Sequence, residues 1–260
     1  MSGARLQSST EGGCLVLTID SPDQRHALTP ELCAAGIEAL NVAESNPEVR
    51  CVVITGAGHA FCTGEPLLGV MATRPGASEA AADAVDALHN WIETIRAFPK
   101  PVIAAVSGTC SGAGLSLAIA CDWVVAARDS AFSLSQSTVG LSPTGGLSWA
   151  LARCLPRATV MQWLMAGDKI SATRLLELGV VNVLCEPTQT LSQALSIAEH
   201  LQKRTDHALA SIKELVNDAQ ETSLHQHLAS ERSHFVRNLH HPETSARLAA
   251  LAQPPHTPPR

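Results

Sequence analysis

Tyrosine is absent from this chain of 260 residues, and aromatic residues make up only 3% of it. A reaction that uses a phenol as its acid is therefore excluded.

Charged residues are 16% of the chain, the net charge is −6, and no basic stripe is present, so nucleic acid is not an expected partner. The apolar runs are too short to span a bilayer, and the first residues lack the basic stretch and apolar core of a signal peptide. We therefore expect a cytoplasmic protein with no membrane or nucleic-acid partner.

C-x-x-C pairs are also missing, although the chain has eight cysteines. Several of these cysteines lie inside apolar runs, which predicts small buried side chains in a reducing compartment rather than a disulfide framework. The eleven histidines are scattered. The denser positions, His225 with His227 and His240 with His241, favour a helical surface, because no carboxylate or cysteine partner is found at ligand spacing. We predict no metal site and no tightly bound cofactor.

Apolar residues are abundant, at 45% of the chain, and gather in four short runs. These runs are apolar nearly throughout, which is typical of strands buried on both faces. The runs are 14–20, 51–56, 101–108 and 121–127. Two helical segments lie between them, 29–46 with Thr29 as N-cap before Pro30, and 77–98. This alternation predicts an α/β fold with crossover connections.

The character of the sequence changes after about Ile170. A helix that stops at Gly179 precedes a short strand, and only helices are expected beyond Leu191. The expected helices are 191–204, 207–220 and 224–239. The end of the chain is proline-rich and typical of a disordered tail. We predict a core over 1–195, a helical region over 196–250 and a tail over 251–260.

Two glycine-rich turns follow two of the apolar runs. They are "TGAGHAFCTGE" and "SGTCSGAG", and the second opens an apolar helix. Each leaves free backbone N–H groups at a strand end, and two such groups converging on one point would form an oxyanion hole. The alternative is that the glycines only close tight turns. Neither turn matches a dinucleotide or phosphate-loop motif, and Ser111 is one place late for a nucleophile elbow.

The same stretches resemble the signature blocks of a known family. "AFCTGEPL", "KPVIAAVSGTCSGAGLSLAIACD", "SAFSLSQSTVGLSPTGG" and "ISATRLLELGVVNVL" resemble the four blocks of the crotonase, or enoyl-CoA hydratase/isomerase, superfamily. The resemblance runs from about residue 12 to 240, and is closest to a bacterial branch of enoyl-CoA hydratases and oxepin-CoA hydrolases. It implies a spiral of ββα turns followed by trimerising helices. It also implies a homotrimer or hexamer with a coenzyme A thioester as substrate.

The resemblance also assigns roles to individual residues. The thioester carbonyl would be polarised by the backbone N–H groups of Glu65 and Ala113. The residues implied to contact coenzyme A are Arg25, Ala27, Gly64 and Gly112.

The sequence departs from the family pattern where the acids are expected. Ser116 and Gln136 stand at the two hydratase glutamates, and Thr144 stands at a third carboxylate position. His89 and Glu65 are the remaining titratable candidates, and each could also be an ordinary surface side chain. Two functions stay open: an enzyme that forms a thioester enolate, and a catalytically silent acyl-CoA-binding or assembly protein of the same fold.

Overall fold

The computed structural model describes residues 4–21, 26–64 and 77–251, and the chain divides into two compact units, Met1–Leu201 and Gln202–Arg260. The first unit holds a large sheet of six strands and a small sheet of four. The large sheet has the order β1 (Arg5–Glu11), β2 (Cys14–Asp20), β3 (Cys51–Gly56), β5 (Val102–Val106), β7 (Trp123–Ala127) and β10 (Val183–Cys185). The small sheet has the order β4 (Ala60–Cys62), β6 (Thr109–Ser111), β8 (Ala131–Ser133) and β9 (Lys169–Ser171).

A ββα unit repeats along the chain and distributes its strands between the two sheets. The first repeat is β1, β2 and α1 (Pro30–Ser45), and the second is β3, β4 and α2 (Ala77–Ala97). The third is β5, β6 and α3 (Ala113–Ala120), after which β7 and β8 continue the pattern. Strands β3, β5 and β7 pair in parallel in the large sheet, and β4, β6 and β8 pair in parallel in the small one. This repetition confirms the predicted α/β spiral and places the ends of β4 and β6 side by side.

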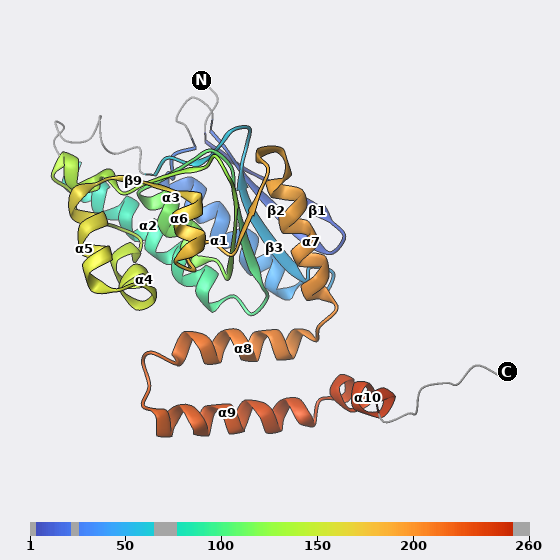
Figure 1. Cartoon of the computed structure of the whole chain (residues 1–260). Helices are drawn as coiled ribbons and strands as arrows, with labels where there is room; N and C mark the ends of the chain where they lie inside the picture. The colour runs from blue at the N-terminus through green and yellow to red at the C-terminus, as the bar shows by residue number, and fades with distance from the viewer. Residues whose placement is uncertain (1–3, 22–25, 65–76, 252–260) are drawn as a thin grey trace. The chain divides into compact units, whose positions relative to one another are not determined.

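The large sheet is buried on both faces, as its apolar strands predict. Successive side chains of a strand point to opposite faces, so Val52 and Ile54 enter one core while Cys51 and Val53 enter the other. Helix α7 (Thr190–Gln202) covers the second face through Ala194 and its neighbours. Figure 1 shows α7 on the side of the large sheet opposite α1 and α2.

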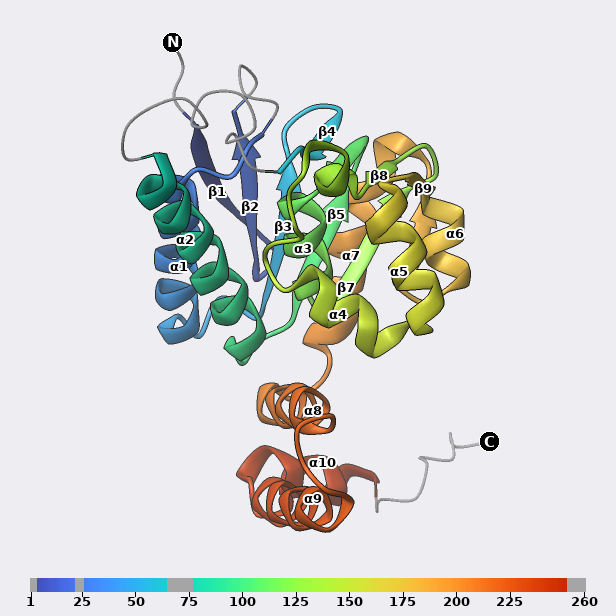
Figure 2. The ribbon, with the colours of Figure 1, turned by 90° about the vertical axis from the view of Figure 1, so that its left-hand side faces the viewer.

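Helices α1 and α2 pack side by side over the first face (Figure 2). Thr29 is the N-cap of α1, as predicted, and its side chain accepts the Leu32 N–H at 3.3 Å. A Cβ on Gly36 would lie 2.2 Å from the Trp91 ring, so this glycine lets the buried indole of α2 approach the backbone of α1. The remaining helices of the unit are η3 (Ser135–Val139), α4 (Leu147–Cys154), α5 (Arg157–Ala166), α6 (Ala172–Glu177) and η4 (Pro187–Gln189).

The second unit is helical, as the sequence predicts, and contains α8 (Asp206–Asp218), α9 (Leu224–Leu239) and α10 (Pro242–Leu251). A capping box joins Ser223 and Gln226 at the start of α9. Helix α10 falls within the helical region expected over 196–250, although the sequence did not mark it as a separate helix, and its last residue is Leu251. The rest of the predicted tail lies outside the described residues.

Two other expectations can be compared with the described residues. Seven of the eight cysteines are buried, as predicted, whereas Cys154 is exposed at the end of α4, so the expectation of burial was wrong for that residue. Among the described helices, none has the length and apolar character needed to cross a membrane.

Candidate active site

The two glycine-rich turns meet at the ends of β4 and β6. The hydroxyl of Ser111 donates to the carbonyl of Thr63 at 2.8 Å and so ties one turn to the other. Gly64 has φ +93°, and a Cβ there would lie 2.9 Å from the Ser111 carbonyl oxygen and 3.2 Å from the Ala113 nitrogen. Only glycine combines that backbone conformation with so close an approach. These glycines therefore do more than close turns, because they bring the two backbones together.

Ala113 begins helix α3 immediately behind this contact. The first N–H groups of a helix have no acceptor within it, and the N-terminus carries partial positive charge. Gly112, the N-cap, has φ +51°, whereas Ala113 is not among the described residues of positive φ. A Cβ is therefore tolerated at Ala113, and its backbone nitrogen lies beside the Gly64 turn.

Ser116 lies one turn further along α3 and is almost fully buried. Its hydroxyl donates to the Thr144 carbonyl at 2.8 Å and lies 3.3 Å from the Gly112 carbonyl. A Cβ on Gly145 would lie 2.7 Å from the Ser116 Cβ, so the chain around residue 145 packs directly on α3. The Ser116 hydroxyl thus fixes this segment and is not placed as a base.

Gln136 lies on η3 and is 6% exposed. Its amide nitrogen would be 2.9 Å from a Cβ on Gly112, so the amide lies against the N-cap of α3. Both polar atoms of the amide are buried and have no hydrogen-bond partner in the part of the chain that the structure describes. Because an unsatisfied buried amide is costly, this group is available to hydrogen-bond a ligand or a water molecule.

His89 approaches the same region from α2 and is half-buried. Its Nε2 accepts the backbone N–H of Gly145 at 3.2 Å. A ring nitrogen that accepts an N–H carries no proton, so the neutral His89 ring is protonated on Nδ1. In this arrangement His89 is a hydrogen-bond donor through Nδ1, and it could act as a base only after releasing Gly145.

Similarity to known proteins agrees with this geometry. The enoyl-CoA hydratase/isomerase family model matches residues 9–251. The chain belongs to this family. It is 32% identical over 228 residues to 1,2-epoxyphenylacetyl-CoA isomerase of Escherichia coli, covering 87% of each chain. It is also 32% identical to 2,3-dehydroadipyl-CoA hydratase of the same organism, covering 85% of each.

A solved structure is similar over nearly the whole chain. The crystal structure of an enoyl-CoA hydratase from Polaromonas sp. JS666 superposes with a TM-score of 0.92 at 55% identity, covering 95% of this chain and 96% of that one. The resemblance seen in the sequence is thus confirmed, as is the prediction of a hydratase/isomerase-type enzyme. The finer placement in a bacterial branch stays a prediction.

The fold of this enoyl-CoA hydratase/isomerase family member brings most of the predicted site residues together. Gly112 and Ser116 lie on or beside α3, and the Gln136 amide lies against Gly112. The His89 ring contacts Gly145, which packs on α3. Thr144 contributes its carbonyl to Ser116. Glu65 and Arg25 lie outside the described residues.

Ala27 lies beside the same turn. It is buried, and the N–H of its neighbour Leu28 donates to the Gly64 carbonyl at 3.0 Å. The segment predicted to contact coenzyme A is therefore joined to the predicted oxyanion turn.

Two positioning residues were missed in the sequence. His26 has φ +59°, accepts the Ser21 N–H on Nδ1 at 3.0 Å and donates from Nε2 to the Ala57 carbonyl at 2.8 Å. Cys62 accepts the Gly64 N–H on Sγ at 3.4 Å, and burial raises the pKa of its thiol to about 12. His26 thus joins the segment after β2 to the β3–β4 turn, and Cys62 holds the turn at Gly64. Neither shows a sequence signal beyond its place next to a motif.

Proposed function

We propose that this protein isomerises acyl-CoA thioesters through an enolate whose oxygen is held by the backbone N–H groups of Glu65 and Ala113. A base removes a proton from Cα of an enoyl thioester, negative charge collects on the carbonyl oxygen, and the protonated base returns the proton to Cγ. The double bond moves into conjugation with the thioester. This reaction needs no cofactor, and it needs no acid–base residue other than the one that removes the proton.

The approach of Gly64 to Ala113 carries this proposal. Residue 65 follows Gly64 directly, and Gly64 lies against the Ala113 nitrogen. Preorganised N–H donors are effective because their cost of orientation is met during folding and not during the reaction. The family membership and the acyl-CoA names of the relatives support a thioester as the ligand.

Isomerisation is favoured over hydration by the side chains around the site. Hydration of the usual kind requires one carboxylate to activate water and another to protonate Cα. Ser116 and Gln136 stand at those positions and cannot do this. We propose Glu65 as the single base and the Gln136 amide as a hydrogen-bond partner of the acyl chain or the thioester.

A second function, acyl-CoA binding without turnover, is favoured by one observation. The polar groups of Ser116 and His89 are engaged with backbone groups inside the protein. If Glu65 does not reach the substrate, the site would hold a thioester without a base.

Self-association as a trimer or a hexamer stays our proposal for the assembly. The second unit exposes large apolar side chains on each of its helices, among them Val216, Phe235 and Leu251. A cytoplasmic location likewise stays a prediction.

The test uses the full chain with a 3-enoyl-CoA and with crotonyl-CoA. We expect the 3-enoyl-CoA to be converted to the conjugated isomer and crotonyl-CoA to remain unhydrated. Gly64→Ala should lower kcat/KM for isomerisation by about 100-fold or more, since its Cβ would displace an oxyanion donor. Gly58→Ala is the matched control, because Gly58 also has positive φ, +67°, but its Cβ would meet nothing within 4 Å.

The outcomes separate the two functions. Loss of isomerisation in Glu65→Gln with retained binding supports the proposed base. Binding of acyl-CoA by the wild type with no turnover of either substrate would establish the silent function instead. Failure to bind any CoA thioester in calorimetry would overturn both.

A further inference from the structure

His26 has a strained backbone conformation beside the active-site turns. Its φ is +59°, and it is the one residue other than glycine with a positive φ in the ranges 4–21, 26–64 and 77–251. This left-handed region is unfavourable for a residue with a Cβ, and such a conformation persists only where the surrounding contacts maintain it. His26 is also buried, so its ring is held entirely by the protein around it.

Both ring nitrogens of His26 are bonded to backbone groups of other segments. Nδ1 accepts the Ser21 N–H at 3.0 Å, and Nε2 donates to the Ala57 carbonyl at 2.8 Å. The His26 N–H donates to the Ser21 carbonyl at 2.9 Å, so two hydrogen bonds join these residues. Ala57 is itself tied to β2, since its N–H donates to the Ile19 carbonyl at 2.9 Å. The ring therefore fixes the start of the segment 26–28 to the end of β2 and to the β3–β4 turn.

The segment that follows His26 holds the carbonyl of Gly64. Ala27 and Leu28 are buried, and the Leu28 N–H donates to the Gly64 carbonyl at 3.0 Å. The N–H of Gly64 donates to Cys62 Sγ at 3.4 Å, so both backbone polar groups of this glycine are held. The hold on the carbonyl depends on the position of Leu28, which lies two residues after the His26 ring.

The Gly64 carbonyl determines the direction of the proposed oxyanion donor. This C=O and the N–H of residue 65 belong to one peptide unit, which is planar and trans, so the two groups point in opposite directions. A hydrogen bond to the carbonyl therefore sets the direction of that N–H. A preorganised donor stabilises an oxyanion only when it is aimed at the position where the charge develops. Rotation of this peptide unit would turn the donor away from the thioester oxygen.

We propose that His26 is a positioning residue of the reaction. Its ring fixes Leu28, and the hydrogen bond from Leu28 to Gly64 aims the N–H of residue 65 at the thioester oxygen. In this role His26 neither contacts the substrate nor transfers a proton. The role rests on the proposed oxyanion donors, and it adds what holds one of them in place.

The test compares variants of the full chain in the isomerisation of a 3-enoyl-CoA. His26→Gly tolerates the positive φ and removes both ring contacts, so kcat should fall by about tenfold or more. KM should change by less than about threefold, because loss of an interaction made only in the transition state lowers kcat and kcat/KM alike. His26→Asn also tolerates the positive φ. It keeps an acceptor near Ser21 but is too short to reach Ala57, so its kcat should also fall.

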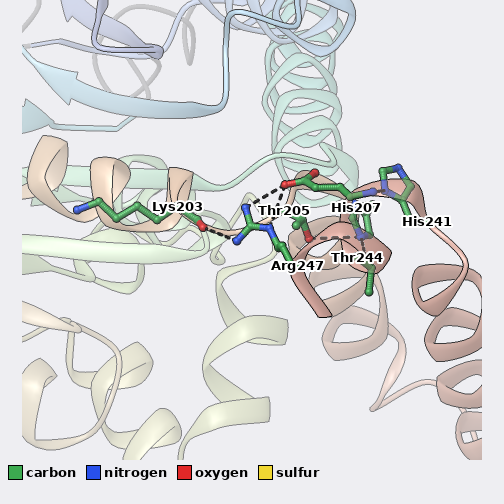
Figure 3. A network of polar contacts seen from close by, with 7 residues as sticks. Lys203, Thr205, His207, His241, Thr244 and Arg247 are labelled. Atoms are coloured by element: carbon green, nitrogen blue, oxygen red, sulfur yellow. Dashed lines mark hydrogen bonds and ion pairs between the residues drawn. The ribbon is translucent and has the colours of Figure 1, made fainter. Parts of the chain in front are cut away.

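Two other histidines serve as matched controls. His59 is exposed in the same turn as Ala57, and His59→Ala should leave kcat unchanged. The ring of His207 in the second unit is hydrogen-bonded, with Nε2 2.9 Å from Thr244 Oγ1 (Figure 3). His207→Ala should lower Tm and leave kcat unchanged, which separates the general effect of losing a histidine hydrogen bond from an effect on Gly64.

A second measurement reports the oxyanion donors without any turnover. The carbonyl stretching frequency of bound crotonyl-CoA, labelled with ¹³C at the thioester, should be lower in the wild-type complex than in water. His26→Gly should return this frequency toward its value in water, and His26→Asn provides the same comparison if His26→Gly does not fold.

The outcomes distinguish this role from the proposed isomerisation. Wild-type kcat and wild-type carbonyl frequency in His26→Gly would overturn the role of His26 while the isomerase function stands. An equal fall of kcat in His26→Gly and His207→Ala would overturn it as well. A lowered frequency in the wild type without isomerisation would overturn the isomerase function, and loss of that shift in His26→Gly would still support the role of His26.

Discussion

Gln136 offers a direct test of the site, because its amide should reduce stability while supporting function. The replacement is Gln136→Met, which keeps the length of the side chain and removes both polar atoms. In the described structure those two atoms are buried and lack hydrogen-bond partners. An unsatisfied buried polar group costs about 1–3 kcal/mol, so we expect the free protein to gain about that much in free energy of unfolding.

The gain can be measured by thermal unfolding without ligand. For a chain of this size, 1 kcal/mol corresponds to a Tm shift of about 2–4 °C. Gln162→Met on α5 is the matched control, because Gln162 is exposed and its replacement should leave Tm nearly unchanged. The same Gln136→Met variant should bind or turn over acyl-CoA at least about tenfold less well, since a hydrogen bond to the ligand is worth about 1.4 kcal/mol or more when the partner is buried.

The opposite sign would refute this reasoning. If Gln136→Met lowers Tm relative to the Gln162→Met control, then the amide is satisfied in the free protein, for example by bound water. If Tm rises while acyl-CoA affinity and turnover are unchanged, then the amide does not contact the ligand. Only a rise in Tm together with a loss of acyl-CoA affinity or turnover supports the placement of Gln136 in the site.

Two more predictions concern buried polar and thiol groups. Ser116→Ala should lower the free energy of unfolding by about 1–2 kcal/mol, because it removes the 2.8 Å hydrogen bond to the Thr144 carbonyl. A denaturant titration measures this loss, and an unchanged free energy of unfolding would show that the hydrogen bond contributes nothing. A thiol reagent at pH 8 should modify Cys154 alone in the folded protein, since it is the one exposed cysteine. Burial raises the pKa of Cys33 and of Cys62 to about 12, so fast labelling of either would contradict the structure.

The fold could be predicted from the sequence where an element is long enough to show a pattern. The runs 14–20 and 51–56 coincide with β2 and β3, and Thr29 caps α1 as expected. The strands of the small sheet, such as β4 and β6, have only three residues each. Three residues cannot display a period of two, so these strands are defined by their partners and not by their own sequence.

The candidate site was predictable in its backbone and less so in its side chains. Glycine is required where φ is positive and another backbone comes close, so Gly64 and Gly112 left a clear mark in the sequence. The orientation of His89 could not be predicted from the sequence, because it depends on the N–H of Gly145, which comes from another part of the chain.

The chemistry of the site follows from which polar groups are already engaged. Ser116 donates its proton to a backbone carbonyl, and His89 offers its free ring nitrogen to a backbone N–H. Neither group can take a proton from a substrate without breaking a contact that holds the segment around Gly145. Among these side chains, the Gln136 amide alone has both its polar atoms unsatisfied, and an amide is neither an acid nor a base at neutral pH. The described side chains of the site therefore offer hydrogen-bonding groups and no free acid or base, which is why the proposed isomerisation depends on Glu65.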